Sequence, residues 1–315
     1  MDPGRFVEEQ VRSVSSSVQG RAIVALSGGV DSTVAAVIVN RAIGERLLAV
    51  YVDTGFMRKG ETERLSSMFS GLGLNHRIVR ASDEFFDALE GESDAERKRV
   101  IIGRKFIELF EKEAGEFDAE YLVQGTIAPD WIESGGSLRD RIKSHHNVAG
   151  LPREMKLKLV EPLRDLYKDE VRLVARYLNI AVSERQPFPG PGLAVRVLGS
   201  VSREDVGIER EACAIVEEEI EKAHAEGKIE ALPWQYFSVL IPVRSVGVQG
   251  DVRAYGRTIV VRAVMSRDAM TARFSHLPPE VLENISTRIT NTLGRSVTRV
   301  VYDITNKPPG TIEWE

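Results

Sequence analysis

An apolar run at residues 21–26 leads directly into the glycine-rich segment SGGVDST, residues 27–33, whose last positions begin a helical pattern. A strand, a tight turn and a helix in immediate succession is an arrangement with which α/β proteins bind phosphate. The two glycines permit a close backbone approach, and the serine and threonine hydroxyls add to the amides of the helix N-terminus. We therefore predict an anion site, with an ordinary packing turn as the alternative.

Two common phosphate loops do not fit this segment. A Walker A motif needs lysine before its final hydroxyl residue, where this chain has Asp31, and a dinucleotide fingerprint needs a third glycine where Ser32 stands. The segment instead resembles the SGGxDS loop of the PP-loop ATP pyrophosphatases. This resemblance implies a site that cleaves ATP between its α- and β-phosphates.

The following residues alternate between strand and helix patterns. Apolar runs and amphipathic stretches succeed one another at residues 47–52, 60–71, 77–79, 94–113 and 121–125. Such alternation predicts an α/β fold with a mostly parallel sheet covered on both faces and with ligands at the carboxyl ends of the strands. Asp53 and Gly125 stand at two such ends, so we expect them to share a crevice with SGGVDST.

Residues 129–156 are polar, contain glycine and are strongly cationic. We predict that this segment is a mobile lid that clamps a polyphosphate by charge, with Lys143 as its best candidate. A solvated surface loop is the alternative.

A proline- and glycine-rich stretch at residues 184–193 cannot continue a helix or a central strand. We place a domain boundary there, with a PP-loop domain at residues 1–190 and a small α+β domain at residues 191–315. The second domain is predicted to contain helices at 203–226 and 279–293 and strands at 237–243, 258–264 and 297–304. A sheet this small often leaves apolar surface for a partner, so we expect self-association.

The composition excludes several classes of protein. A chain of 315 residues with 43% hydrophobic residues and a net charge of −5 is an ordinary globular composition without the basic footprint of a nucleic-acid-binding protein. We find no apolar span long enough for a membrane and no signal peptide, and so expect a cytoplasmic location. The one cysteine, Cys213, lies in a helical pattern and is expected to be buried, which excludes an internal disulfide and a built-in glutaminase of the cysteine type.

Further motifs extend the resemblance over nearly the whole chain. They are, in order, QGT at 124–126, IKSHHNV at 142–148, LVEPLRD at 159–165, PFPGPGL at 187–193, PVRSVGVQGD at 242–251 and KPPGTIEWE at 307–315. Together they resemble the ATP-pyrophosphatase and dimerisation portions of the GMP synthetases. This implies a PP-loop domain of the adenine nucleotide alpha hydrolase type followed by a dimerisation domain.

The resemblance also implies a ligase reaction, in which xanthosine monophosphate (XMP) is aminated to GMP through an adenylyl-XMP intermediate, with release of AMP and pyrophosphate. Asp31 would place Mg²⁺, and Asp31 and Lys143 would be catalytic. The residues implied in ATP binding are Ser27, Gly28, Gly29, Val30, Asp31, Ser32, Thr33, Asp53 and Gly125.

The XMP-binding residues are carried over from the same motifs. They are Arg99, Arg185, Gln249, Lys307, Ile312 and Glu313. Glu313 would accept hydrogen bonds from ring N–H groups of the base. An exposed helix charge is the alternative for Arg99, and a tail that docks as an edge strand is the alternative for residues 307–315.

No glutaminase domain precedes the PP-loop segment in this sequence. The resemblance therefore implies the synthetase subunit of a split, archaeal-like enzyme, a homodimer that receives ammonia from a separate glutaminase subunit. An ammonia-dependent ligase similar to NAD synthetase and a noncatalytic nucleotide-binding module remain as alternatives. The first would leave the KPPGTIEWE tail unexplained, and the second would have no use for Asp31 and Lys143.

Overall fold

The computed structural model describes residues 1–128, 157–180, 186–267 and 269–315. The chain forms two compact units. The first comprises Met1–Asp53, Thr62–Arg80 and Phe106–Glu184, and the second comprises Thr54–Glu61, Ala81–Lys105 and Arg185–Glu315. Two segments from the first half of the sequence thus belong to the second unit. The division into residues 1–190 and 191–315 stays a prediction for the folding domains.

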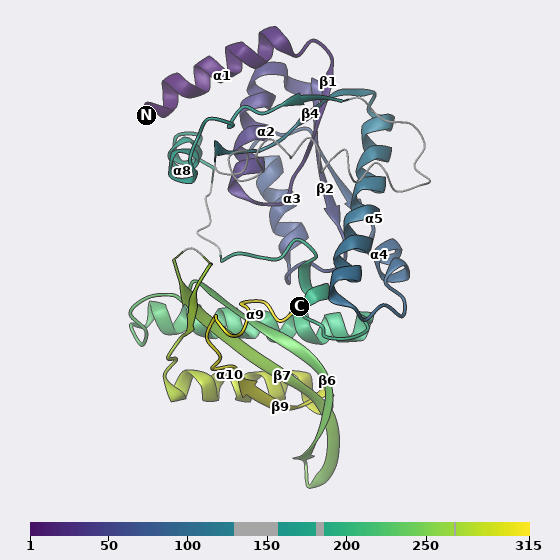
Figure 1. Cartoon of the computed structure of the whole chain (residues 1–315), viewed down its shortest axis with the longest axis vertical. Helices are drawn as coiled ribbons and strands as arrows, with labels where there is room; N and C mark the ends of the chain where they lie inside the picture. Colours follow the sequence, from purple (N-terminus) through teal and green to yellow (C-terminus); the bar gives the residue numbers. More distant parts are fainter. Residues whose placement is uncertain (129–156, 181–185, 268) are drawn as a thin grey trace. The chain divides into compact units, whose positions relative to one another are not determined.

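The first unit is built on a parallel sheet of five strands (Figure 1). Its spatial order is β3-β2-β1-β4-β5, and all its described pairings are parallel. The strands are β1 (Arg21–Ala25), β2 (Leu47–Asp53), β3 (His76–Arg80), β4 (Ala119–Val123) and β5 (Lys158–Val160). The predicted α/β alternation is confirmed, because the strands expected at 47–52, 77–79 and 121–125 are all present.

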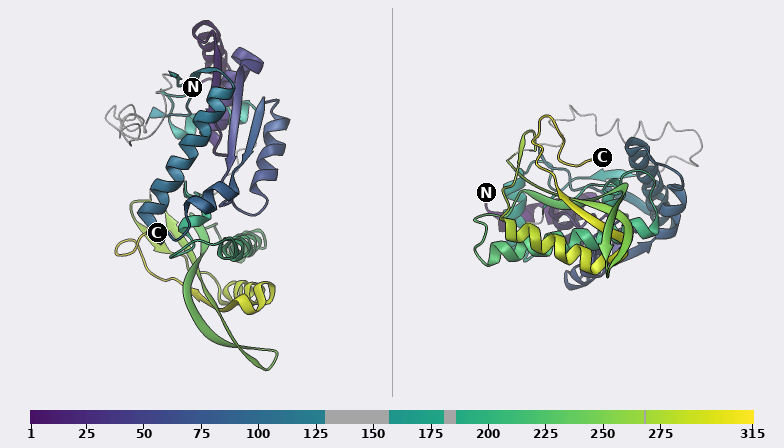
Figure 2. Two further views of the ribbon diagram at one scale, coloured as in Figure 1. Left: turned by 90° about the vertical axis from the view of Figure 1, so that its right-hand side faces the viewer. Right: turned by 90° about the horizontal axis from the view of Figure 1, so that it is seen from below.

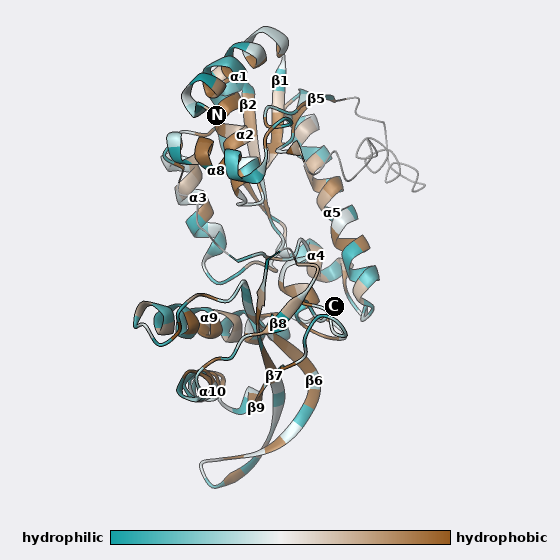
Figure 3. Ribbon diagram, turned by 60° about the vertical axis from the view of Figure 1, so that its left-hand side comes forward, coloured by the Kyte–Doolittle hydropathy of each residue, from teal (hydrophilic) through white to brown (hydrophobic). Residues whose placement is uncertain are grey.

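Helices cover this sheet on both sides (Figure 3). They are α1 (Pro3–Ser17), α2 (Val30–Ile43), α3 (Glu61–Gly71), α8 (Lys168–Tyr177) and the later turns of α5 (Ala95–Glu116). α2 packs against β1, β2 and β4 and is itself covered by α1 and α8. Its middle turns are therefore apolar on nearly every side, with Val34 and Ile38 fully buried.

The second unit contains a four-stranded sheet. Its strands are β6 (Gln235–Gln249), β7 (Val252–Ser266), β8 (Ala272–Phe274) and β9 (Val297–Tyr302). β6 and β8 pair antiparallel with β7, whereas β9 pairs parallel with it. The long helices α9 (Arg203–Ala225) and α10 (Pro279–Leu293) contact each other and lie on the same side of the sheet (Figure 2).

The remaining elements of the described chain are short. They are α4 (Ser82–Ala88) and the 3-10 helices Gly44–Arg46, Gly192–Val195 and Gly294–Ser296. The helices predicted at 203–226 and 279–293 are confirmed by α9 and α10. None of the helices in the described ranges is both long and apolar enough to cross a membrane.

β6 and β7 are longer than the sequence predicts, because they continue past the apolar runs into a hairpin arm (Figure 1). Gly250 and Asp251 at its turn both have positive φ, of 56° and 60°, the backbone of a tight two-residue hairpin turn. Val248 and Tyr255 on the arm are 73% and 62% exposed. The arm is therefore a strand pair with apolar side chains in solvent, and its hydrogen-bonded register, not a buried face, defines it.

Candidate active site

The glycine-rich segment forms a turn between β1 and α2 in the first unit. Gly28 has φ of +78°, the left-handed region, and a Cβ there would lie 2.9 Å from the Leu65 side chain. Gly29 is the N-cap of α2 and gives that helix no side-chain cap. The amides of the first turn of α2 are therefore available to an anion, as the sequence predicts for this turn.

Hydroxyl groups line the same turn. Ser27 Oγ and Ser32 Oγ lie 3.3 Å apart, and the Gly29 amide donates to Ser27 Oγ at 3.3 Å. Thr33 Oγ1 donates to the Gly29 carbonyl at 2.8 Å, which ties the turn to the helix. Ser27 is exposed and Ser32 is partly so. The two serine hydroxyls can therefore reorient towards a phosphate, whereas Thr33 is held in place.

The turn lies at the point where the strand order reverses. β1 pairs with β2 on one side and with β4 on the other, and ligands of open parallel sheets bind at such a point, beyond the carboxyl ends of the strands. Gly125 follows β4, and a Cβ there would lie 2.8 Å from the carbonyl carbon of Asp31 and from the Ser32 amide nitrogen. Only glycine allows this loop to lie directly against the first turn of α2.

Asp53 ends β2 at the same edge of the sheet. Its Oδ2 accepts a hydrogen bond from Thr62 Oγ1 at 2.9 Å, and the Arg80 guanidinium is 3.8 Å away. The structure thus brings together the residues predicted to bind ATP, namely residues 27–33, Asp53 and Gly125. Their role in binding ATP remains a prediction.

Asp31 has a cationic partner that sequence reasoning missed. Lys168 Nζ, at the start of α8, lies 2.6 Å from Asp31 Oδ2. A lysine in the first turn of a helix opposes the helix dipole, and that conflict is the signal that marks Lys168 in the sequence. The pair places one positive and one negative charge directly at the phosphate turn.

The other oxygen of Asp31, Oδ1, is buried and has no hydrogen-bond partner among the residues that the structure describes. The same holds for Oε1 of Gln124, the residue that precedes Gly125. A buried oxygen without a partner costs free energy, on the order of 1–3 kcal/mol, unless a ligand or water satisfies it. Both atoms lie where a nucleotide and its metal would bind.

This donor set suits Mg²⁺ bound mainly through a substrate. Mg²⁺ is commonly held by one or two carboxylates together with phosphate oxygens and water. The Asp31 carboxylate beside the phosphate turn meets that requirement. Within the described ranges no group of three or more His, Cys, Asp and Glu side chains could hold a metal by itself.

The tail of the second unit, residues 303–315, is anchored by a buried arginine. Arg262 donates to the carbonyls of Thr311 at 2.7 Å, Ile312 at 2.8 Å and Thr305 at 3.0 Å. It also forms a 2.7 Å ion pair with Asp303. The guanidinium is 1% exposed, so these acceptors take the place of its water.

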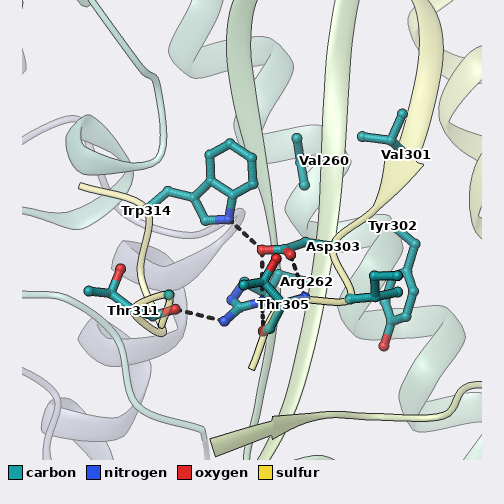
Figure 4. Close-up of a pocket in the computed structure, with 10 residues that line it drawn as sticks. Val260, Arg262, Val301, Tyr302, Asp303, Thr305, Thr311 and Trp314 are labelled. Carbon is teal, nitrogen blue, oxygen red and sulfur yellow. Dashed lines mark hydrogen bonds and ion pairs between the residues drawn. The ribbon is translucent and has the colours of Figure 1, made fainter. Parts of the chain in front are cut away.

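A pocket of about 500 Å³ lies beside this anchor (Figure 4). Trp314 closes one side, with its indole N–H donating to Asp303 Oδ2 at 3.0 Å. Outside the pocket, a single antiparallel bridge joins residue Lys307 to Ala272. The tail is therefore docked on its own unit, chiefly through side chains and only at one point as an edge strand.

Glu313 is held by two donors. Arg196 contacts its two carboxylate oxygens at 2.9 and 3.2 Å, and Gln235 Nε2 donates to Oε1 at 2.7 Å. Arg196 is fully buried, with its guanidinium carbon 4.2 Å from the centre of the Phe237 ring. Sequence reasoning missed Arg196, although an arginine in the apolar run after PFPGPGL is the signal that marks it.

Arg99 lies at the end of the tail, where its Nη2 donates to the Glu315 backbone oxygen at 2.5 Å. The neighbouring Lys98 is fully buried and contacts the Glu315 carboxylate at 2.5 Å. Lys307 Nζ donates to the Ala269 carbonyl at 2.8 Å, and Ile312 is 7% exposed. The structure thus gathers four of the six residues predicted to bind XMP on one tail, namely Arg99, Lys307, Ile312 and Glu313.

The other predicted residues are not part of this group. Gln249 ends β6 at the tip of the hairpin arm, which extends away from the tail in every view (Figures 1 and 2). Arg185, Lys143 and the predicted lid at residues 129–156 lie outside the described residues. Cys213 is 2% exposed in α9, as predicted, and burial raises the pKa of its thiol to about 12.

Known proteins resemble both units. Residues 218–314 match the family described as GMP synthase C terminal domain, and residues 4–102 match the family NAD synthase. Three similar proteins are each named as one and the same subunit of glutamine-hydrolyzing GMP synthase. They come from Pyrococcus horikoshii (58% identical), Methanopyrus kandleri (59%) and Thermoplasma acidophilum (53%). Each alignment covers 100% of this chain and at least 99% of the relative. The chain therefore belongs to the family that this subunit of glutamine-hydrolyzing GMP synthase defines.

Proposed function

We propose that this chain is the synthetase subunit of a GMP synthase, a ligase that aminates XMP to GMP at the expense of ATP. The observation that carries the proposal is the phosphate turn at the switch point, with a buried oxygen of Asp31 left for a ligand. A tail that presents the fixed carboxylate of Glu313 occurs in the same chain. Membership of the GMP synthase family supports this function for the two features.

The first step activates the base. The oxygen at C2 of xanthine is a poor leaving group, so it attacks the α-phosphorus of ATP, and the bond between the α-phosphorus and the bridging oxygen breaks. Pyrophosphate leaves, and adenylyl-XMP is formed. The amides of α2 and the hydroxyls of Ser27 and Ser32 bind the departing phosphates, and positioning with charge neutralisation supplies the catalysis.

The second step forms the C–N bond. Ammonia attacks C2, and the C2–O bond breaks, so that AMP leaves with the oxygen that belonged to xanthine. The nitrogen gives up the surplus proton, and GMP remains. Because water at C2 would regenerate XMP and waste ATP, the site must admit ammonia and exclude water.

Several binding roles belong to this proposal. Asp31 holds Mg²⁺, which when bound neutralises charge on the phosphate oxygens, and Lys168 binds the same phosphates. Lys143 closes on them from the predicted lid. On the tail, Lys307 and Arg99 bind the XMP phosphate and Glu313 binds the base, together with Ile312, Arg185 and Gln249.

A homodimer would complete this set of residues. The hairpin arm extends away from the tail of its own unit and exposes Val246, Val248 and Tyr255. We propose that the arm docks on a second copy and brings Gln249 to the tail of that copy. A separate glutaminase subunit supplies the ammonia in the cytoplasm, as the naming of the relatives as one subunit of a glutamine-hydrolyzing enzyme suggests.

The test uses the purified chain with Mg-ATP and XMP. The proposal expects GMP and AMP in equal amounts with ammonium chloride and neither with glutamine. GMP formed from glutamine would contradict the separate glutaminase. Absence of AMP under both conditions would contradict the synthetase function, and nicotinate adenine dinucleotide in place of XMP would then test the activity of an NAD synthase.

A further inference from the structure

We propose that Arg196 and Gln235 are positioning residues that fix the Glu313 carboxylate for recognition of the xanthine base. The inference rests on the proposed function and goes one step beyond it. It concerns two side chains that do not contact substrate themselves but set the charge and orientation of one that does.

The geometry of the three side chains defines one orientation. Arg196 Nη2 lies 2.9 Å from Glu313 Oε1, and its Nε lies 3.2 Å from Oε2. A guanidinium that engages both oxygens of a carboxylate fixes the plane of the carboxylate as well as its position. Gln235 Nε2 adds a second bond to Oε1 at 2.7 Å.

The Gln235 amide cannot turn its oxygen towards Glu313 without loss. Its Nε2 also donates to the Pro187 carbonyl at 3.2 Å, and Gln235 is 3% exposed. Both neighbours of the amide nitrogen are therefore acceptors, which defines the orientation of the amide. Arg196 is equally fixed, because its guanidinium carbon lies 5.1 Å from the centre of the Phe188 ring and 4.2 Å from that of Phe237.

Arg196 faces three titratable groups, and only one of them takes its charge. Besides Glu313, these are Cys213 and Glu209 of α9. Burial raises the pKa of Cys213 to about 12 and that of Glu209 to about 8, so both are mostly neutral at pH 7. The charge of Arg196 is thus available to hold Glu313 ionised.

The free edge of Glu313 decides what it recognises. Oε1 has two donors, whereas Oε2 has one long contact, so Oε2 retains acceptor capacity. The Glu313 side chain is 19% exposed, enough for a ligand to reach it. An ionised carboxylate only accepts hydrogen bonds, so the fixed group selects a base that presents ring N–H donors.

The experiment measures KM for XMP, KM for ATP and kcat in the ammonium assay. The variants are Arg196→Met, Arg196→Lys and Gln235→Leu, with Glu209→Gln as the matched control in the same buried cluster. Arg196→Met should raise KM for XMP about 10- to 100-fold, since a lost charged hydrogen bond costs about 1.5–3 kcal/mol. KM for ATP should stay within about twofold, Arg196→Lys should fall between wild type and Arg196→Met, and the control should match wild type.

A pH series separates positioning from simple structural support. Without Arg196 the pKa of Glu313 rises, so the ratio of the variant's KM for XMP to that of wild type should fall as pH increases from 5.5 to 8. Titration of XMP itself cancels in this ratio. A purely structural loss would give the same ratio at every pH.

Failure of the inference is distinct from failure of the function. If the wild-type chain forms no GMP, the proposed function fails. If wild type is active but Gln235→Leu and Arg196→Lys leave KM for XMP unchanged, the positioning role is wrong. A parallel rise of both KM values, independent of pH, would also contradict it. Since Arg196→Met is the variant most at risk of misfolding, the conservative Arg196→Lys and Gln235→Leu keep the test valid without it.

Discussion

The phosphate turn of the first unit and the tail of the second treat charge in opposite ways. At the turn, Asp31 has one exposed partner, Lys168, and one buried oxygen without a partner among the described residues. On the tail, both oxygens of Glu313 are engaged by fully or nearly buried donors. One carboxylate is left incomplete until a ligand arrives, and the other is completed in advance.

The difference teaches where each kind of binding energy arises. A site that must neutralise new charge during a reaction gains from groups that become satisfied only with the substrate bound. A site that must distinguish one base from another gains from a rigid group that cannot adapt to the wrong base. The turn therefore fits the chemistry of ATP cleavage, and the tail fits recognition of XMP.

The largest expected effect is at the incomplete carboxylate. Asp31→Asn keeps the shape of the side chain but removes the charge that would bind metal and face Lys168. We expect AMP formation to fall about 10²- to 10³-fold, the usual loss for an electrostatic group at a reacting centre. XMP binding, measured by calorimetry, should not change. Unchanged turnover would remove Asp31 from the mechanism and break the contrast between the two sites.

Gly125→Ala tests whether the turn is built from backbone. The new Cβ would lie 2.8 Å from backbone atoms of Asp31 and Ser32, so the first turn of α2 must shift. Overpacking of this kind costs about 1–3 kcal/mol, and we expect KM for ATP to rise roughly tenfold or more. Gly115→Ala is the control, because open space surrounds that helical glycine. Equal ATP kinetics in the two variants would show that the close contact does not shape the site.

Lys168→Met should have a smaller effect, since the Lys168 side chain is 45% exposed and its pair with Asp31 is screened by water. We expect KM for ATP to rise about three- to tenfold, with a weaker dependence on salt than in wild type. Lys59→Met is the control, because Lys59 forms a comparable exposed pair with Glu211 in the other unit. An identical salt dependence in Lys168→Met and wild type would place Lys168 outside the ATP site.

The smallest effect concerns stability at the completed site. The pKa of Glu209 is raised by burial to about 8, above its ordinary value of 4.5, so the folded chain retains a proton that the unfolded chain has lost. Stability must therefore fall as pH increases from about 5 to 8. Glu209→Gln should lessen that fall, as measured by melting temperatures at pH 5.5 and 8. Parallel pH curves for variant and wild type would mean that Glu209 is charged and competes for Arg196.

The sequence predicts those parts of the molecule that depend on local pattern. The SGGVDST turn, the α/β alternation and helices α9 and α10 follow from periodicity and glycine placement, and all are present. Lys168 and Arg196 were missed because their partners, Asp31 and Glu313, are distant in sequence, so that only folding brings the charges together. The outer part of the hairpin arm was missed because it lacks the buried alternation that marks a strand.

The most direct test of the account follows the xanthine oxygen. The chain would be given XMP labelled with ¹⁸O at C2, together with Mg-ATP and ammonium chloride, and the AMP produced would be analysed by mass spectrometry. If the C2 oxygen attacks the α-phosphorus, each AMP formed with GMP carries one ¹⁸O. Unlabelled AMP alongside labelled pyrophosphate or labelled water would contradict adenylyl-XMP as the intermediate and, with it, the assignment of the turn to cleavage of ATP at its α-phosphate.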